Sequence, residues 1–203
     1  MYSKVLGPLL FPIFINDIVR SIEFVIKLFA DDTSMTLGHT NPDIRTETLT
    51  NDLEKNSEWA KLWKVNEEKT ELVNIKGDTK PIHQLTFGNV VLEEKPHHKH
   101  LGITLQNNRK WDEHISNLSS KVSMLINCLR HFKYKLSRKA LETMYKSFIL
   151  LLFDYADIIW DSCTVVQSTS LENLHLEAPR IITGSVRGTS HQKLYNKAGF
   201  CAL

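Results

Sequence analysis

The chain has 203 residues, of which 42% are hydrophobic, 24% charged and 9% aromatic, and its formal net charge is +2. These values are typical of globular domains, and they exclude a chain that is disordered, collagen-like or a coiled coil throughout. The three cysteines, Cys128, Cys163 and Cys201, lie far apart in the sequence. Such spacing predicts neither a disulfide framework nor a cysteine zinc site, and it fits a reducing compartment.

The apolar run at residues 5–15 has the wrong features for a secretory signal. Pro8 and Pro12 interrupt it, and Asn16 and Asp17 follow where a cleavage site would need small residues. The apolar stretch 148–153 is too short to cross a bilayer. We therefore expect an intracellular protein, nuclear or cytoplasmic, that is not secreted and does not interact with membranes.

The first half of the chain predicts short strands between helices. Gly7-Pro8 is a turn signal that leads into a helix within residues 5–22. Gly88-Asn89 is typical of a two-residue hairpin turn. Alternating or β-rich patterns predict strands at residues 24–29, 34–37, 73–75, 85–87, 90–92 and 101–105, and helical periodicity predicts a helix at 44–64.

The second half predicts helices. Apolar residues recur at helical spacing between Ile115 and Leu129. Ser137 is a suitable N-cap for a second helix, and a third is expected at residues 170–182. The sequence therefore predicts the α+β class, with short antiparallel strands and helices up to a boundary near residue 110 and helices after it.

The charge is unevenly distributed. Residues 109–150 contain nine Lys or Arg and three Asp or Glu, which gives +6, so the rest of the chain carries +2 minus +6, or −4. A local basic segment is a candidate surface for an anionic partner. A solvated helix face explains the same composition.

Two adjacent aspartates, Asp31 and Asp32, lie at the tip of the hairpin predicted from strands 24–29 and 34–37. Carboxylate oxygen is the ligand that Mg²⁺ prefers, and Mg²⁺ commonly shares its site with substrate phosphates. A site for two metal ions usually needs a further carboxylate from a neighbouring strand. Asp-Asp is also common in ordinary turns, so the pair alone does not decide between the two interpretations.

Five sequence blocks surround and follow the two aspartates. They are residues 5–11 (Val-Leu-Gly-Pro-Leu-Leu-Phe), 15–18 (Ile-Asn-Asp-Ile), 28–34 (Leu-Phe-Ala-Asp-Asp-Thr-Ser), 63–71 (Trp-Lys-Val-Asn-Glu-Glu-Lys-Thr-Glu) and 100–105 (His-Leu-Gly-Ile-Thr-Leu). In their order and spacing, these blocks resemble the reverse transcriptases of non-LTR retrotransposons of the jockey-like and related types. With the following helical region, the resemblance covers almost the whole chain.

The resemblance implies a role for each matching residue. Asp31 and Asp32 match the metal-binding pair of the polymerase palm, where two Mg²⁺ ions act, and Lys69 matches a lysine proposed to protonate the leaving pyrophosphate. The other matching residues are Gly7, Pro8, Phe29 and Ala30 for nucleotide and template, Lys99 and a hairpin at Leu101 and Gly102 for the primer end, and Lys133, Lys135, Arg138 and Lys139 for the duplex.

The resemblance also implies an organisation and an activity. Residues 1–110 match part of a reverse transcriptase palm, residues 111–160 a helical thumb-like region, and residues 161–203 a C-terminal helical extension. The family reaction is RNA-directed DNA synthesis from an RNA template, a DNA primer and deoxynucleotides. The strand with the upstream catalytic aspartate has no counterpart before Val5. We therefore expect this chain to be inactive alone, and a non-catalytic nucleic-acid-binding relic is the alternative.

Two further groups of residues have an ordinary structural explanation. The histidines His97, His98 and His100 match no zinc spacing, and a polar loop before a strand accounts for them. Trp59 and Trp63 are four residues apart on the predicted helix, where core packing is a simpler explanation than base stacking.

Overall fold

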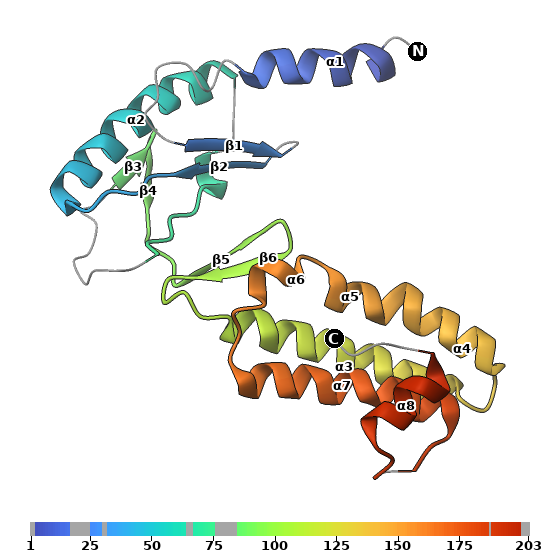
Figure 1. Ribbon diagram of the computed structural model, residues 1–203. Helices are drawn as coiled ribbons and strands as arrows, with labels where there is room; N and C mark the ends of the chain where they lie inside the picture. Colours follow the sequence, from blue (N-terminus) through green and yellow to red (C-terminus); the bar gives the residue numbers. More distant parts are fainter. Residues whose placement is uncertain are drawn as a thin grey trace. The chain divides into compact units, whose positions relative to one another are not determined.

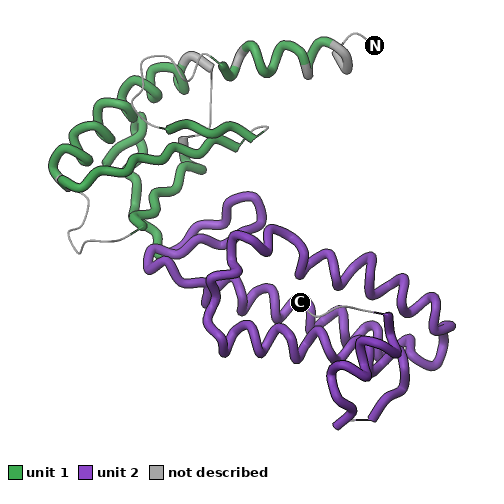
Figure 2. The backbone as a smooth tube through the Cα atoms, in the orientation of Figure 1, with its two compact units in different colours: residues 1–96 green, residues 97–203 purple. Residues whose placement is uncertain are grey.

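The computed structural model describes residues 3–16, 25–29, 32–63, 67–75, 85–186 and 188–199. It divides the chain into two compact units, residues 1–96 and residues 97–203 (Figure 2). Helices and short antiparallel strands make up both units, which confirms the α+β class (Figure 1). In the part of the chain that the structure describes, no helix combines the length and the apolar character needed to span a membrane.

The first unit contains an N-terminal helix, two hairpins and a long helix. Its elements are α1 (Ser3–Ile15), β1 (Val25–Phe29), β2 (Asp32–Thr36), α2 (Pro42–Trp63), the 3-10 turn η2 (Glu67–Lys69), β3 (Leu85–Phe87) and β4 (Val90–Leu92). Strand β1 pairs only with β2, and β3 pairs only with β4, among the described residues. Both hairpins were predicted from the sequence and are confirmed.

The small core of the first unit lies between α2 and the β3–β4 hairpin. Leu53 and Ala60 of α2 are buried together with Leu85 and Phe87 of β3. The β1–β2 hairpin contacts α2 through the Asn56 amide, whose Nδ2 lies 3.7 Å from the Met35 sulfur. Strand β1 in contrast is largely exposed.

Two predictions in this unit are wrong. Gly7 and Pro8 lie inside α1 and do not form a turn. The φ of proline, near −65°, fits helical backbone, although inside a helix a proline removes one hydrogen bond and its ring crowds the preceding turn. The strand predicted at residues 73–75 is also absent, and the described backbone there makes only an isolated bridge between Leu72 and Glu94. Residues 17–24, the end of the helix predicted within 5–22, lie outside the described residues.

The second unit is a helical bundle with a short hairpin at its start. Its elements are β5 (His97–His100), β6 (Ile103–Gln106), α3 (Asp112–Phe132), α4 (Arg138–Met144), the π-helix η3 (Tyr145–Leu150), α5 (Leu151–Asp154), α6 (Asp157–Trp160), α7 (Val165–Thr183) and α8 (His191–Ala198). The predicted apolar stripe of α3 is confirmed, because Ile115, Val122 and Leu129 are buried against the other helices.

The hairpin β5–β6 corrects two further expectations. Residues 97–100 form a strand, where the sequence predicted a polar loop. Leu101 and Gly102 form the turn of a hairpin, as the resemblance implied, although the residue pattern predicted a strand there. Ile103 is buried in the core of the helical bundle, so this hairpin belongs to the second unit. The division into palm, thumb and extension stays a prediction.

Candidate functional site

The β1–β2 hairpin presents one of the two predicted carboxylates. Asp32 begins β2 and pairs directly with Phe29 at the end of β1. Both side chains are exposed, and 61% of the Phe29 surface is accessible. Ala30 and Asp31, which connect the strands, lie outside the described residues. The structure therefore confirms a hairpin at this place but leaves the aspartate pair as a prediction.

The described residues do not by themselves provide a site for two metal ions. No group of three or more His, Cys, Asp or Glu side chains gathers as a metal site within the described ranges. Asp32 contributes one exposed carboxylate, whereas two ions held side by side need several. Lys69 ends η2 with an exposed side chain, and no described hydrogen bond or ion pair connects it to the hairpin.

The β5–β6 turn has a defined and strained geometry. Leu101 and Gly102 have φ values of 46° and 86°, as a two-residue type I′ turn requires. Tyr155 supports the turn, because its hydroxyl donates a hydrogen bond to the Leu101 carbonyl at 2.5 Å. The Tyr155 ring lies so close that a Cβ added at Gly102 would be 3.3 Å from its Cε1 atom. Lys99 is exposed on β5 beside this turn.

The connection between α3 and α4 presents the predicted duplex-binding lysines. Ser137 caps α4 as predicted, and its Oγ accepts a hydrogen bond from the Ala140 amide at 3.3 Å. Lys135 and Lys139 are exposed, and neither makes an ion pair with a described carboxylate. Lys133 is half-buried, with its Nζ 5.4 Å from the centre of the Tyr134 ring.

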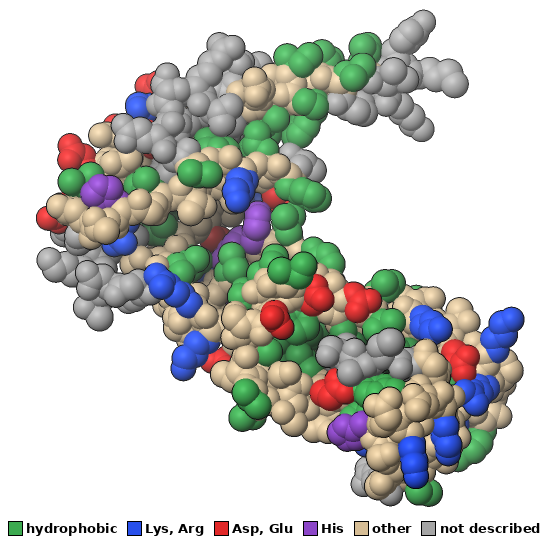
Figure 3. All heavy atoms as spheres, viewed as in Figure 1, with side chains coloured by type: hydrophobic (Ala, Val, Ile, Leu, Met, Phe, Trp, Pro, Cys, Tyr) green, Lys and Arg blue, Asp and Glu red, His purple; other side chains and the backbone are tan. Residues whose placement is uncertain are grey.

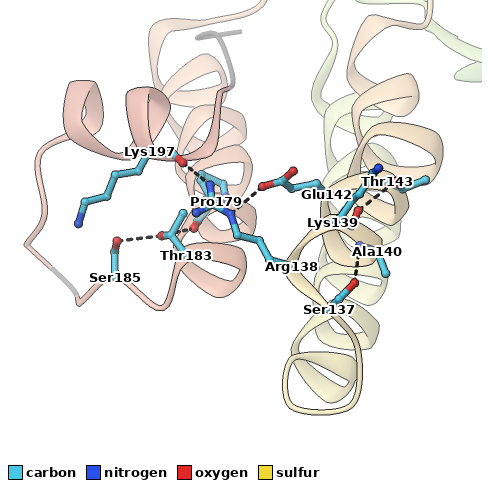
Figure 4. A network of polar contacts seen from close by, with 10 residues as sticks. All are labelled: Ser137, Arg138, Lys139, Ala140, Glu142, Thr143, Pro179, Thr183, Ser185 and Lys197. Carbon is cyan, nitrogen blue, oxygen red and sulfur yellow. Dashed lines mark hydrogen bonds and ion pairs between the residues drawn. The ribbon is translucent and has the colours of Figure 1, made fainter.

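Arg138 differs from these lysines because its guanidinium group is engaged within the bundle. Its Nε donates to Glu142 Oε1 at 2.8 Å, and its Nη2 donates to the Lys197 carbonyl oxygen. Figure 4 shows the Arg138 side chain extending from α4 between Glu142 and the backbone of α8. The sequence placed all four cations in one duplex-binding group, and the structure separates Arg138 from the three lysines by these contacts.

A buried polar cluster connects η3, α7 and α8. The Tyr145 hydroxyl and His175 Nδ1 share a hydrogen bond, and the Tyr195 hydroxyl donates to Glu172. Burial raises the pKa of both tyrosine hydroxyls, and the neighbouring Glu172 carboxylate raises that of Tyr195 further. Both tyrosines therefore stay neutral, and their hydroxyls make hydrogen bonds that connect α7 to η3 and to α8.

Charged side chains are segregated on the helical unit. Figure 3 shows Lys and Arg side chains gathered at the end of the unit where α4 and α8 lie, and acidic side chains over α5 and α6. Residues 97–203 contain fourteen Lys or Arg and eight Asp or Glu, so this unit carries +6. A polyanion would therefore be attracted to the α4–α8 end.

Comparison with known proteins gives two relatives. The chain is 26% identical over 164 residues to the Retrovirus-related Pol polyprotein from type-1 retrotransposable element R1 of Bradysia coprophila, a match that covers 76% of this chain. It is 24% identical over 197 residues, or 90% of this chain, to the RNA-directed DNA polymerase from mobile element jockey of Drosophila melanogaster. The chain is related to non-LTR retrotransposon reverse transcriptases. The resemblance inferred from the sequence blocks is thereby confirmed.

The retrotransposon proteins are much longer than this chain. The match covers 16% of the R1 polyprotein and 21% of the jockey polymerase. No protein-family profile and no solved structure matches the chain. The relationship to retrotransposon polymerases therefore rests on sequence, and the roles of individual residues are proposals.

Sequence reasoning missed three features of this retrotransposon-related chain. Tyr155 supports the β5–β6 turn, and Arg138 connects α4 to α8. The third feature is a pair of exposed lysines on α8, Lys193 and Lys197. Their spacing of four residues, in a segment without acidic residues, is a signal that could have identified them.

Proposed function

We propose that this chain is part of an RNA-directed DNA polymerase of a mobile element, and that residues 97–203 bind the duplex of RNA template and DNA primer. The relatives support the polymerase assignment. The observation that carries the binding role is the exposure of Lys135 and Lys139 at the α3–α4 corner without carboxylate partners among the described residues. Lys133 adds a third cation beside them.

The first unit has a proposed role in the longer polymerase. There, Asp31 and Asp32 would be ligands of Mg²⁺, and Lys69 would donate a proton to the leaving pyrophosphate. Exposure of Asp32 and Lys69 supports this assignment. Nucleotide and template would lie along Gly7, Pro8, Phe29 and Ala30, and the primer end would lie against Lys99, Leu101 and Gly102.

For the 203-residue chain itself, we propose nucleic-acid binding without polymerisation. No third strand pairs with β1 or β2 among the described residues, whereas a site for two metal ions usually needs a further carboxylate from a neighbouring strand. A primer-extension assay with this chain, a primed RNA template, deoxynucleotides and Mg²⁺ or Mn²⁺ is expected to give no product. A template-dependent extension product would contradict this part of the proposal.

Duplex binding is tested with a fluorescently labelled 20-base-pair DNA duplex over a range of salt concentrations. Each phosphate neutralised by a lysine releases counterions, so the logarithm of affinity falls with the logarithm of salt concentration at about −0.9 per contact. With roughly three to five contacts in all, the Lys135→Ala/Lys139→Ala variant should lower the slope by about two units. An RNA–DNA duplex should bind with little sequence preference as well.

The matched control is the Lys27→Ala/Lys61→Ala variant, which removes the same charge from exposed positions in the first unit. It should bind like the parent. If both variants lose affinity equally, net charge alone explains the binding and the corner has no specific role. If the parent chain does not bind duplex at 50 mM salt, the nucleic-acid role fails, and an interaction module without nucleic-acid binding becomes the better interpretation.

A further inference from the structure

Helix α8 has one apolar face and one cationic flank. Leu194, Tyr195 and Ala198 are buried, whereas Lys193 and Lys197 are exposed and make no ion pair with a described residue. Residues four apart on a helix lie on the same side, about 5–6 Å apart, so the two lysines form a short cationic row. Residues 183–203 contain three Lys or Arg and no Asp or Glu, so no acidic residue near them in sequence offsets this charge.

The position of α8 within the bundle is specified by its buried face. Leu194 and Tyr195 pack against Leu176 of α7 in a small apolar cluster. The Tyr195 hydroxyl donates to Glu172, also on α7. These contacts fix α8 against α7 and leave the lysine flank exposed.

Arg138 provides the second connection, between α8 and α4. Its Nη2 donates to the carbonyl oxygen of Lys197, in the last turn of α8, where helical carbonyls lack partners. Glu142 holds the other edge of the guanidinium group at 2.8 Å and fixes its orientation. A guanidinium group can make both contacts at once because its donors form a rigid planar fork.

The contacts of Arg138 bring the lysines of α8 and the lysines of the α3–α4 corner to the same end of the second unit. Figure 4 shows the Lys197 side chain pointing away from Arg138, and Lys139 follows Arg138 in the first turn of α4. Figure 3 shows the basic side chains of this end together on one face, over α8 and the adjoining end of α4. The charge of Arg138 itself is largely compensated by Glu142.

We propose that α8 is a second nucleic-acid-binding element, in which Lys193 and Lys197 contact phosphates of the same duplex that the α3–α4 corner binds. Arg138 is then a positioning residue, which holds α8 beside α4 and does not itself contact the duplex. This inference rests on the proposed function. It extends the binding surface into residues 161–203. The lysines of α8 would contact the phosphate backbone and not the bases, so no base sequence is preferred.

The first test is the Lys193→Ala/Lys197→Ala variant of the full chain, with the 20-base-pair DNA duplex as probe. Each lost phosphate contact should weaken binding about eightfold at 0.1 M salt and lower the salt slope by about 0.9. The charge-matched Lys27→Ala/Lys61→Ala variant should bind like the parent. Both α8 lysines are exposed, so the fold should be retained, and circular dichroism checks this.

The second test is Arg138→Lys, which keeps the charge but removes the planar fork. Hydrogen exchange should become faster across residues 191–198, and duplex affinity should fall severalfold although the net charge is unchanged. A purely electrostatic contribution of Arg138 would leave both measurements near the parent values. If hydrogen exchange across α8 became faster but the duplex affinity stayed at the parent value, the positioning role would also be wrong.

The outcomes separate this inference from the proposed function. If Lys135→Ala/Lys139→Ala weakens binding and Lys193→Ala/Lys197→Ala does not, the corner binds duplex and α8 has only a solvated lysine flank. If the parent does not bind duplex at all, the proposed function itself fails. Loss of affinity and of salt slope in both lysine variants, but not in the matched control, supports a surface that includes α8.

Discussion

At the scale of single residues, His114 connects the β5–β6 hairpin to α3. It is buried, and its Nδ1 accepts a hydrogen bond from the Thr104 amide at 3.4 Å. Its ring lies 6.2 Å from the rings of Trp111 and Trp160. Burial lowers the pKa of His114 below its usual range, and the charge of Lys121 lowers it further. The folded protein therefore favours the neutral ring, whose Nδ1 can accept the hydrogen bond from the Thr104 amide.

The first prediction is that His114 makes stability depend on pH. Because its pKa is lower in the folded than in the unfolded chain, the unfolded chain binds more protons near and below the ordinary histidine pKa of about 6.5. The free energy of unfolding should then fall as the pH is lowered from 7.5 towards 5.5. Urea unfolding at several pH values measures this. His114→Gln should flatten the dependence, whereas His191→Gln, at an exposed position, should leave it unchanged.

The second prediction concerns Tyr155. Tyr155→Phe keeps the ring against Gly102 but removes the hydrogen bond to the Leu101 carbonyl. A typical hydrogen bond contributes about 0.5–1.5 kcal/mol, so the second unit should lose about that much stability in urea unfolding. Amides of residues 97–106 should exchange faster, since the turn loses its support.

The control for Tyr155 is Tyr134→Phe, which removes a hydroxyl from a side chain that is 90% exposed. This variant should match the parent in both measurements. Equal protection of residues 97–106 in the parent and in Tyr155→Phe would show that the type I′ turn holds its geometry without the tyrosine.

At the scale of elements, the β1–β2 hairpin has little support from the rest of the described chain. Val25, Leu28 and Phe29 of β1 are exposed, and β1 has no second neighbouring strand among the described residues. A two-stranded hairpin is at best marginally stable in water. The exposed edge also offers unpaired backbone groups to another strand.

The third prediction follows from this exposure. Hydrogen exchange should be fast across residues 25–29 and 32–36 and much slower in α3, whose apolar stripe is buried. Replacing Lys27 of β1 by alanine should not change this difference in exchange rate between the hairpin and α3. Comparable protection in the hairpin and in α3 would mean that the hairpin is covered in solution, for example by self-association through β1.

The elements that the sequence predicted well have strong local signals. The turn at Gly88, the apolar stripe of α3 and the Ser137 cap each depend on residues close in sequence. The β5 strand was missed because His97–His100 has no alternation of apolar and polar residues. Leu101 gives no turn signal either, since a leucine with positive φ is uncommon and depends here on Tyr155, 54 residues away.

The candidate site was likewise predictable only where the signal lies in the local sequence, and not where it depends on long-range contacts. The sequence blocks identified the relationship to retrotransposon polymerases, which the two relatives confirm. The sequence could not show that Arg138 contacts α8, because that partner is a backbone carbonyl 59 residues later, and every residue type has one. The position of the α8 lysines beside α4 depends on the same long-range contact.

At the scale of the whole molecule, the two units differ in charge as well as in structure. Residues 97–203 carry +6, so residues 1–96 carry +2 minus +6, or −4. The helical unit also has the larger apolar core, which includes residues from β6, α3, η3 and α7. A polyanion should therefore bind the second unit more tightly than the first.

The fourth prediction is that residues 97–203, produced as a separate protein, fold and bind duplex DNA. The core around Val122, Tyr145 and Leu171 lies within this unit, so its packing does not require residues 1–96. Removing 96 residues with a net charge of −4 takes away repulsion but none of the lysines proposed to contact the duplex. The affinity at low salt should accordingly equal or exceed that of the full chain, while the salt slope stays the same because the phosphate contacts are the same.

Circular dichroism with urea unfolding checks the fold, and fluorescence anisotropy checks the binding. A folded second unit that binds duplex much more weakly than the full chain would mean that residues 1–96 contribute contacts of their own, and the division of roles between the two units would then be wrong.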